Sequence, residues 1–77
     1  MLTGVNFSKV QNEIQSMIGD VRRAKKMTQE ELGHIVGLET KSISDIETNR
    51  RKASVPTLIK ILYALDIDIK KVLGIKQ

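Results

Sequence analysis

The chain has 77 residues, 40% of them hydrophobic, and its 13 Lys and Arg residues against 9 Asp and Glu residues give a formal net charge of +4. This length is about half that of an average domain, so it excludes two independent domains and predicts a single domain over residues 1–77. The absence of cysteine excludes disulfides and thiolate zinc sites, and a single histidine excludes imidazole metal clusters. The core must therefore be aliphatic. The excess of basic over acidic residues suits a polyanionic partner.

The sequence also argues against a membrane protein and against an enzyme. Its longest purely apolar run covers residues 61–65, far short of the roughly 20 residues of a membrane span. No basic segment followed by an apolar stretch indicates a secretory signal, so we expect a cytoplasmic protein. A glycine-rich phosphate loop and a paired nucleophile and base are both missing. We therefore predict no catalytic residue, no metal and no cofactor.

Apolar residues recur at helical spacing from the start of the chain, which predicts an all-α fold. The first predicted helix is capped by Ser8 or Asn6, ends near Lys26, and carries one apolar stripe: Val10, Ile14, Met17, Ile18 and Val21. Thr28 followed by Glu31 forms a capping box that marks the start of a second helix. Gly37 ends this helix, because glycine accepts the left-handed conformation that a helix C-terminus needs.

Three more helices are predicted in the second half of the chain. The third begins around Thr40, buries Ile43, Ile46 and Glu47 on one face, and ends with Asn49 in a left-handed conformation. A basic loop over residues 50–53 follows. Ser54 caps a fourth helix that is apolar almost all round, which is typical of a helix in a core or at an interface. Asp68 caps a short fifth helix.

The second and third helices, joined by a tight glycine turn in a basic all-helical chain, form the pattern of a helix-turn-helix over residues 28–48. Gly37 makes the turn, and Gly33 lies where the two helices cross most closely. Apolar residues occupy the positions that two such helices must bury against each other, namely Leu32, Val36, Leu38, Ile43 and Ile46. These requirements are met together, which makes the pattern specific.

Residues 18–73 resemble the helix-turn-helix family of phage repressors, Cro proteins and their bacterial relatives, the Xre-type regulators. The resemblance is carried by three segments with ungapped family spacing: Met27-Thr28-Gln29-Glu30-Glu31-Leu32-Gly33, Ile43-Ser44-Asp45-Ile46-Glu47 and Ser54-Val55-Pro56-Thr57-Leu58. It implies a compact five-helix, lambda-repressor-like domain. This sequence departs from the family in having Gly33 for alanine, Asn49 for glycine and Ala53 for proline. Residues 1–12 lie outside the resemblance, and we expect residues 1–8 to form a flexible arm.

The resemblance also implies a DNA-binding site. It places the base-contacting positions on the third helix, at Thr40, Lys41, Ser44 and Asp45. A lysine can donate to guanine O6 or N7, and an aspartate can accept from cytosine N4. The implied phosphate-contacting positions are Gln29 at the start of the second helix and, in and before the basic loop, Asn49, Arg50, Arg51 and Lys52.

Each of these assignments has a plainer alternative. Gln29 fits equally well as an ordinary polar residue of a first helical turn. Lys41 and Asp45 lie four residues apart, so they fit an exposed ion pair on the helix surface, and such a pair does not exclude base contacts. The basic residues 50–52 fit a solvated loop in an arbitrary protein.

Arg22 and Glu47 are predicted to form a structural salt bridge. Arg22 follows Ile14 and Ile18 at helical spacing, and Glu47 follows Ile43, so both charges face inward. A charge that faces a core needs a partner, and each is the natural partner of the other. The resemblance implies a salt bridge at the same two positions, between the first helix and the third.

We expect the protein to bind double-stranded DNA as a homodimer at a palindromic operator and to repress or autoregulate transcription, because one domain of this size makes few base contacts. The predicted dimer interface consists of C-terminal apolar residues beyond the needs of the core: Ile67, Ile69, Val72, Leu73 and Ile75. Closure of the monomer core is the alternative role for these residues. An antitoxin that also binds a toxin, and a restriction–modification controller, are the alternative functions.

Overall fold

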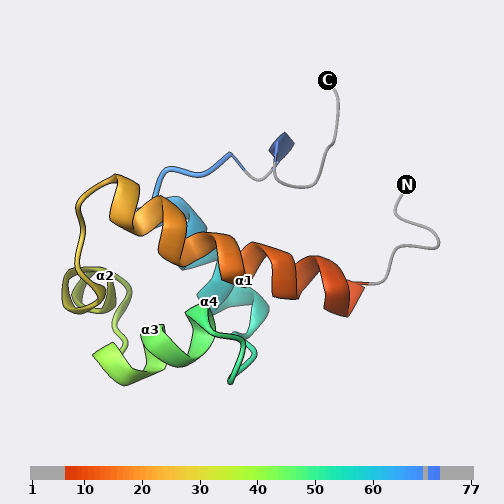
Figure 1. Ribbon diagram of the computed structural model, residues 1–77, viewed down its shortest axis with the longest axis horizontal. Coiled ribbons are helices and arrows are strands. Elements are labelled where there is room, and N and C mark those ends of the chain that lie inside the picture. Colours follow the sequence, from red (N-terminus) through yellow and green to blue (C-terminus); the bar gives the residue numbers. More distant parts are fainter. Residues whose placement is uncertain (1–6, 69, 72–77) are drawn as a thin grey trace.

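The computed structural model describes residues 7–68, 70 and 71, and this part of the chain contains four helices and no strand. The helices are α1 (Phe7–Ala24), α2 (Gln29–Val36), α3 (Thr40–Glu47) and α4 (Val55–Ala64). Helix α3 contacts both α1 and α2, and α4 contacts α2. Figure 1 shows α1 as the long helix across the molecule, with α2 and α3 near one side of it. The all-α prediction is confirmed. None of these helices is both long and apolar enough to cross a bilayer.

Helix α1 begins directly after Asn6, one of its two predicted caps, and ends two residues before Lys26. It begins at Phe7, so the last two residues of the expected arm are helical and Ser8 lies inside the helix. Residues 1–6 lie outside the described residues. The helix ends at Ala24, two residues before Lys26, which itself adopts a left-handed conformation with a φ of 57°. The chain therefore turns toward α2 immediately after the basic last turn of α1.

The start of α2 shows the predicted capping box. The N–H of Glu31 donates to Thr28 Oγ1 at 3.0 Å, and the N–H of Thr28 donates to Glu31 Oε1 at 2.8 Å. At the other end Gly37 has a φ of 78°, which only glycine adopts at little cost. The N–H groups of Gly37 and Leu38 both donate to the carbonyl oxygen of Gly33. The turn of the helix-turn-helix is therefore closed by backbone hydrogen bonds.

Gly33 is needed for a different close approach from the one that the sequence suggested. A Cβ atom at this position would overlap the carbonyl oxygen of Leu38, whereas the side chain of Ile43 on α3 lies farther away, at 3.5 Å. The tightest approach thus joins α2 to the turn rather than to α3. Backbone atoms cannot move as easily as a side chain, so glycine suits this turn.

The second half of the chain follows the predicted boundaries. Helix α3 begins at Thr40, and Asn49 just after its end has a φ of 62°. Ser54 caps α4 by accepting a hydrogen bond from the N–H of Thr57 at 3.3 Å. The predicted fifth helix is described only at residues 70 and 71, which are helical. The N–H of Lys70 donates to Asp68 Oδ1 at 2.9 Å, as expected for a capping residue.

The core is aliphatic and draws on all four helices. Its fully or almost fully buried members are Ile18, Leu32, Ile43, Ile46, Ala53, Ile61 and Leu65. Burying one large aliphatic side chain stabilises a fold by about 1.5–3 kcal/mol, so a small set of this kind supplies most of the driving force for folding. Helix α4 also leaves one stripe at helical spacing exposed, with Val55 at 55%, Ile59 at 52% and Tyr63 at 87%. Helix α4 is apolar almost all round, but only one of its faces packs into the core.

The capping box predicts a pH-dependent contribution to stability. The backbone N–H of Thr28, followed by its hydroxyl, holds the pKa of Glu31 below its ordinary value of 4.5. A depressed pKa in the folded state stabilises the fold above the unfolded pKa, and this stabilisation is lost as the pH falls through the folded pKa. We expect the stability difference between wild type and Glu31→Gln to be full at neutral pH and to shrink as the pH drops below about 4.5.

Urea unfolding at a series of pH values measures this difference. The matched control is Glu30→Gln, which removes a carboxylate from the same helical turn without touching the capping box. A Glu31→Gln difference that stayed constant from neutral to acid pH would contradict the prediction.

Candidate nucleic-acid interface

The four predicted base-contacting residues share one face of α3. Thr40 and Lys41 are exposed, and one turn later Ser44 and Asp45 are half-buried. Residues spaced in this way lie together on a helix surface. The opposite face of α3 is held in the core by side chains that are 1% exposed, namely Ile43 and Ile46. The core therefore fixes which face of α3 is presented outward.

Lys41 and Asp45 form an ion pair along this face, in which the lysine is exposed and the aspartate is half-buried. The distance from Lys41 Nζ to Asp45 Oδ2 is 3.6 Å, and the side chains are 85% and 22% exposed. A helix surface pair of this kind is worth only about 0.3–0.5 kcal/mol. Each group can therefore leave this pair for another partner at a small cost in free energy. The geometry fits both a surface ion pair and contacts with bases.

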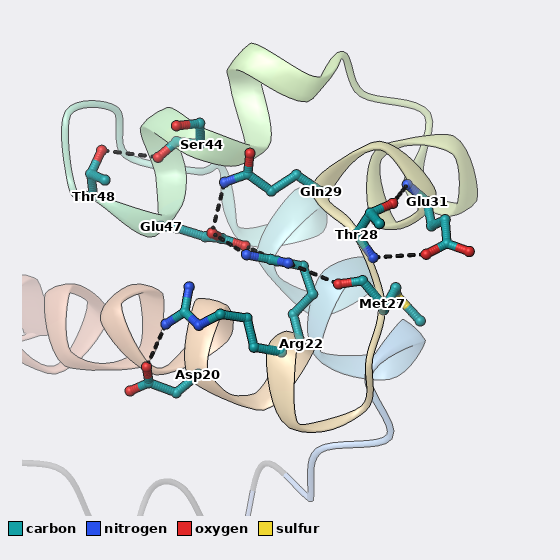
Figure 2. Close-up of polar contacts among 10 residues, drawn as sticks. Asp20, Arg22, Met27, Thr28, Gln29, Glu31, Ser44, Glu47 and Thr48 are labelled. Carbon is teal, nitrogen blue, oxygen red and sulfur yellow. Dashed lines mark hydrogen bonds and ion pairs between the residues drawn. The ribbon is translucent and has the colours of Figure 1, made fainter.

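Arg22 and Glu47 come together in a buried pair that joins α1 to α3 (Figure 2). Arg22 Nε donates to Glu47 Oε2 at 2.7 Å, and Arg22 Nη2 donates to Glu47 Oε1 at 3.2 Å. The side chains are only 9% and 7% exposed. A third guanidinium nitrogen, Nη1, donates to the carbonyl oxygen of Met27 at 2.8 Å. Fork-like, charge-assisted hydrogen bonds of this kind are strong and directional.

Gln29, predicted as a phosphate contact, is part of the same network. Its Nε2 donates to Glu47 Oε1 at 3.0 Å, as Figure 2 shows, so the amide is directed toward α3. Sequence reasoning gave Gln29 and Glu47 separate roles, because residues 18 positions apart give no pairwise signal. The Arg22–Glu47 pair thus also fixes the position of the first residue of α2.

The predicted phosphate-contacting residues after α3 are all exposed, and the first of them is hydrogen-bonded to α1. The amide Nδ2 of Asn49 donates to Ser16 Oγ at 2.8 Å and to the carbonyl oxygen of Asn12 at 3.2 Å. The Asn49 amide is therefore bonded to α1, while the residue itself is exposed, and its contact with a phosphate stays a prediction. The three exposed cations of this segment are Arg50, Arg51 and Lys52.

The three cations differ in how strongly they are held. Arg51 Nη1 donates to Ser42 Oγ on α3 at 3.0 Å. Lys52 Nζ donates to Ser8 Oγ at 2.6 Å and to Asn12 Oδ1 at 3.3 Å, both on α1. The guanidinium of Arg50 makes no hydrogen bond or ion pair with the described residues. Arg51 is therefore held beside α3 and Lys52 beside the first turns of α1. Their partners are neutral hydroxyl and amide groups, which leave the positive charges uncompensated.

Gln15 is the residue that sequence reasoning missed. It is 0% exposed on α1, and its side chain contacts the end of α3 and the following loop. The only sequence signal was a glutamine between Ile14 and Ile18, at the edge of the apolar stripe. In the described part of the chain, no group of three His, Asp or Glu side chains comes together.

These features define a helix-turn-helix domain of the DNA-binding class: two short helices at a tight glycine turn, a polar outward face on the second of them, and a cationic loop after it. The sequence profile of a helix-turn-helix family matches residues 18–72. The chain belongs to this family, the helix-turn-helix domains of the Xre, Cro and lambda-repressor type. Comparison with curated proteins gave no match, and neither did comparison with solved structures.

The buried pair generates a stability prediction. Glu47→Ala leaves the Arg22 guanidinium buried without its carboxylate, so we expect it to lower the free energy of unfolding by roughly 3–5 kcal/mol. In a domain of this size such a reduction approaches the whole stability. The matched control is Asp20→Ala, which removes the exposed Asp20–Arg23 pair on α1 and should cost less than about 1 kcal/mol. Thermal and urea unfolding measure both, and equal melting temperatures for Glu47→Ala and wild type would rule out a structural role.

Proposed function

We propose that this protein is a transcriptional regulator that binds double-stranded DNA by inserting α3 into the major groove. The observation that carries the proposal is the arrangement of α3, whose inner face is fixed in the core while Thr40, Lys41, Ser44 and Asp45 line its outer face. The major groove admits one α-helix, and its base edges offer donors and acceptors to such side chains. The formal charge of +4 supports association with a polyanion.

Within this proposal the base contacts and the phosphate contacts come from different segments. Lys41 and Asp45 supply a donor and an acceptor on α3, which can distinguish one base pair from another. Asn49 and the three cations Arg50, Arg51 and Lys52 belong to the segment after α3, where they contact the phosphate backbone and carry no sequence information. Gln29 adds a phosphate contact from the first turn of α2, held in place by Glu47.

This division predicts two kinds of variant. Lys41→Ala or Asp45→Ala should change the base preference. Each good hydrogen-bonded contact with a base that is lost should reduce the discrimination between bases by about 1–3 kcal/mol. Arg51→Ala should weaken binding to all sequences alike and lower the slope of log K against log salt by about one unit. Selection from a random duplex pool identifies the preferred sequence, and fluorescence anisotropy on that sequence and on random duplex measures the variants. If Lys41→Ala weakened binding equally on both, Lys41 would not contact a base.

We further propose that the protein acts as a homodimer on a palindromic operator and represses transcription. Two-fold pairing places two α3 helices in successive major grooves, about 34 Å apart, and doubles the number of base contacts. The proposed interface is the apolar C-terminal segment. Of its members only Ile67 is described, and it packs partly buried against the core. Residues 69, 72, 73 and 75 lie outside the described residues.

The dimer proposal is tested at Val72. Val72→Glu introduces a charge into the proposed interface, so it should convert a dimer to a monomer while leaving most of the helix content intact. Sedimentation equilibrium measures the mass, and circular dichroism measures the helix content. Lys71→Glu changes the charge of the exposed neighbouring residue and serves as the control. A wild-type monomer that still bound its operator tightly would contradict the homodimer.

An antitoxin or a restriction–modification controller is the alternative function. The observation that favours the antitoxin is the exposed stripe of α4, formed by Val55, Ile59 and Tyr63, because an antitoxin needs a protein-binding surface besides its DNA-binding face. Neighbouring genes separate these roles directly. A toxin gene beside this one favours the antitoxin, a methyltransferase gene favours the controller, and phage genes favour a phage repressor.

A further inference from the structure

Helix α1 carries a row of polar side chains beside its apolar stripe. These five side chains recur at spacings of three and one residues, so they lie on one face of the helix, and we call them the polar row: Ser8, Gln11, Asn12, Gln15 and Ser16. Every member contacts the segment that follows α3, through side chain or backbone atoms of residues 46–53. The polar row thus holds the segment that bears the three exposed cations.

Gln15 is the buried member of this row and makes the most hydrogen bonds. Its Nε2 donates to the carbonyl oxygens of Ile46 at 2.9 Å and Arg51 at 3.0 Å, and more weakly to Asn49 Oδ1 at 3.3 Å. Its Oε1 accepts from the N–H of Ala53 at 3.1 Å and from Gln11 Nε2 at 3.0 Å. One amide therefore uses both its donor and its acceptor capacity, and it spans the end of α3 and the whole basic loop.

The burial of these hydrogen bonds makes the amide hard to replace by water. Gln15 is 0% exposed, and two of the residues whose backbone it contacts, Ile46 and Ala53, are 1% and 6% exposed. Leaving a buried backbone group without its partner costs far more than leaving an exposed one, because the buried group was desolvated on folding. The backbone from residue 46 to residue 53 consequently has one well-defined path while Gln15 is present.

That path determines where the loop cations lie relative to α3. The Arg51 carbonyl is bonded to Gln15, and Ala53 directly follows Lys52, so Gln15 holds the main chain on both sides of Lys52. Phosphate oxygens are fixed points on a duplex, so a cation contributes fully only if its backbone is already in register with the helix in the groove. Gln15 itself is fully buried and has no surface to offer to DNA.

We infer that Gln15 is a positioning residue for phosphate binding: by holding residues 46–53 on α1, it aligns Arg51 and Lys52 with the DNA backbone while α3 occupies the groove. This inference rests on the proposed DNA-binding function and deepens it. It assigns part of the affinity for the phosphate backbone to a buried amide on α1, outside the helix-turn-helix. A role in stability alone is the competing explanation, and the salt dependence of binding separates the two.

The experiment compares wild type with Gln15→Leu, which keeps much of the side-chain volume and removes every hydrogen bond of the amide. The probe is a short random-sequence DNA duplex, at a temperature where circular dichroism shows each protein to be folded. We expect Gln15→Leu to bind about 10–100-fold more weakly and to lower the salt slope by about two units, one for each phosphate that Arg51 and Lys52 no longer neutralise. The control is Leu65→Val, a core truncation at the opposite end of α4 from Ser54 that lowers stability without altering the loop. It should keep the wild-type slope.

A double-mutant cycle sharpens the distinction. In wild type, Arg51→Ala should lower the slope by about one unit. In the Gln15→Leu background it should change the slope little, because Arg51 no longer reaches its phosphate there. If Gln15→Leu does not fold, Gln11→Ala takes its place. This variant removes the hydrogen bond of 2.7 Å to the Ala53 carbonyl oxygen. It should also lower the salt slope, by less than Gln15→Leu does.

The outcomes separate the positioning role from the function on which it rests. A folded Gln15→Leu or Gln11→Ala protein with the wild-type slope, or an Arg51→Ala effect that is unchanged in the Gln15→Leu background, overturns the positioning role and leaves DNA binding intact. A wild-type protein without salt-dependent binding to duplex DNA overturns the proposed function and the positioning role together.

Discussion

The buried pair of Arg22 and Glu47 is the interaction on which the rest of the arrangement depends. Two opposite charges removed from water destabilise a fold unless their remaining hydrogen-bonding groups are also satisfied. Here the Met27 carbonyl and the Gln29 amide complete the coordination, so one network joins α1, the turn after it, α2 and α3. Helices α2 and α3 are short, and α1 meets the pair in its last turn, so the pair fixes the relative positions of these three helices.

The aliphatic core and the polar network have different tasks in this domain. Burial of Ile18, Ile43 and Ile46 supplies free energy, but apolar packing is non-directional and tolerates small rotations of a helix. Hydrogen bonds require defined distances and angles. Helix α3 and the chain after it are held by two such sets, Arg22 with Glu47 at the end of the helix and Gln15 along the following loop. The outward face of α3 is therefore presented in a single orientation.

The proposed DNA surface rests on both the buried core and these hydrogen bonds. Lys41 and Asp45 lie on a helix whose inner face is buried, and Arg51 and Lys52 lie on a loop whose backbone is bonded to α1. Preorganisation of this kind lowers the entropy cost of binding, because the side chains that meet the ligand start from an ordered backbone. Under the proposed function, helix α1 contributes to recognition without belonging to the helix-turn-helix itself.

The sequence by itself determined the local features of this protein. Thr28 with Glu31, Gly37, Asn49 and Ser54 act within a few residues of chain, so each helix boundary that they predicted is found, and apolar spacing identified the core. The inward charges of Arg22 and Glu47 could also be paired, since each had few alternatives. The tertiary structure alone decided the role of Gln15, the direction of the Asn49 side chain and the bond from Gln29 to Glu47. These hydrogen bonds join residues far apart in the chain, and a polar side chain gives no periodic signal of the backbone group it will meet.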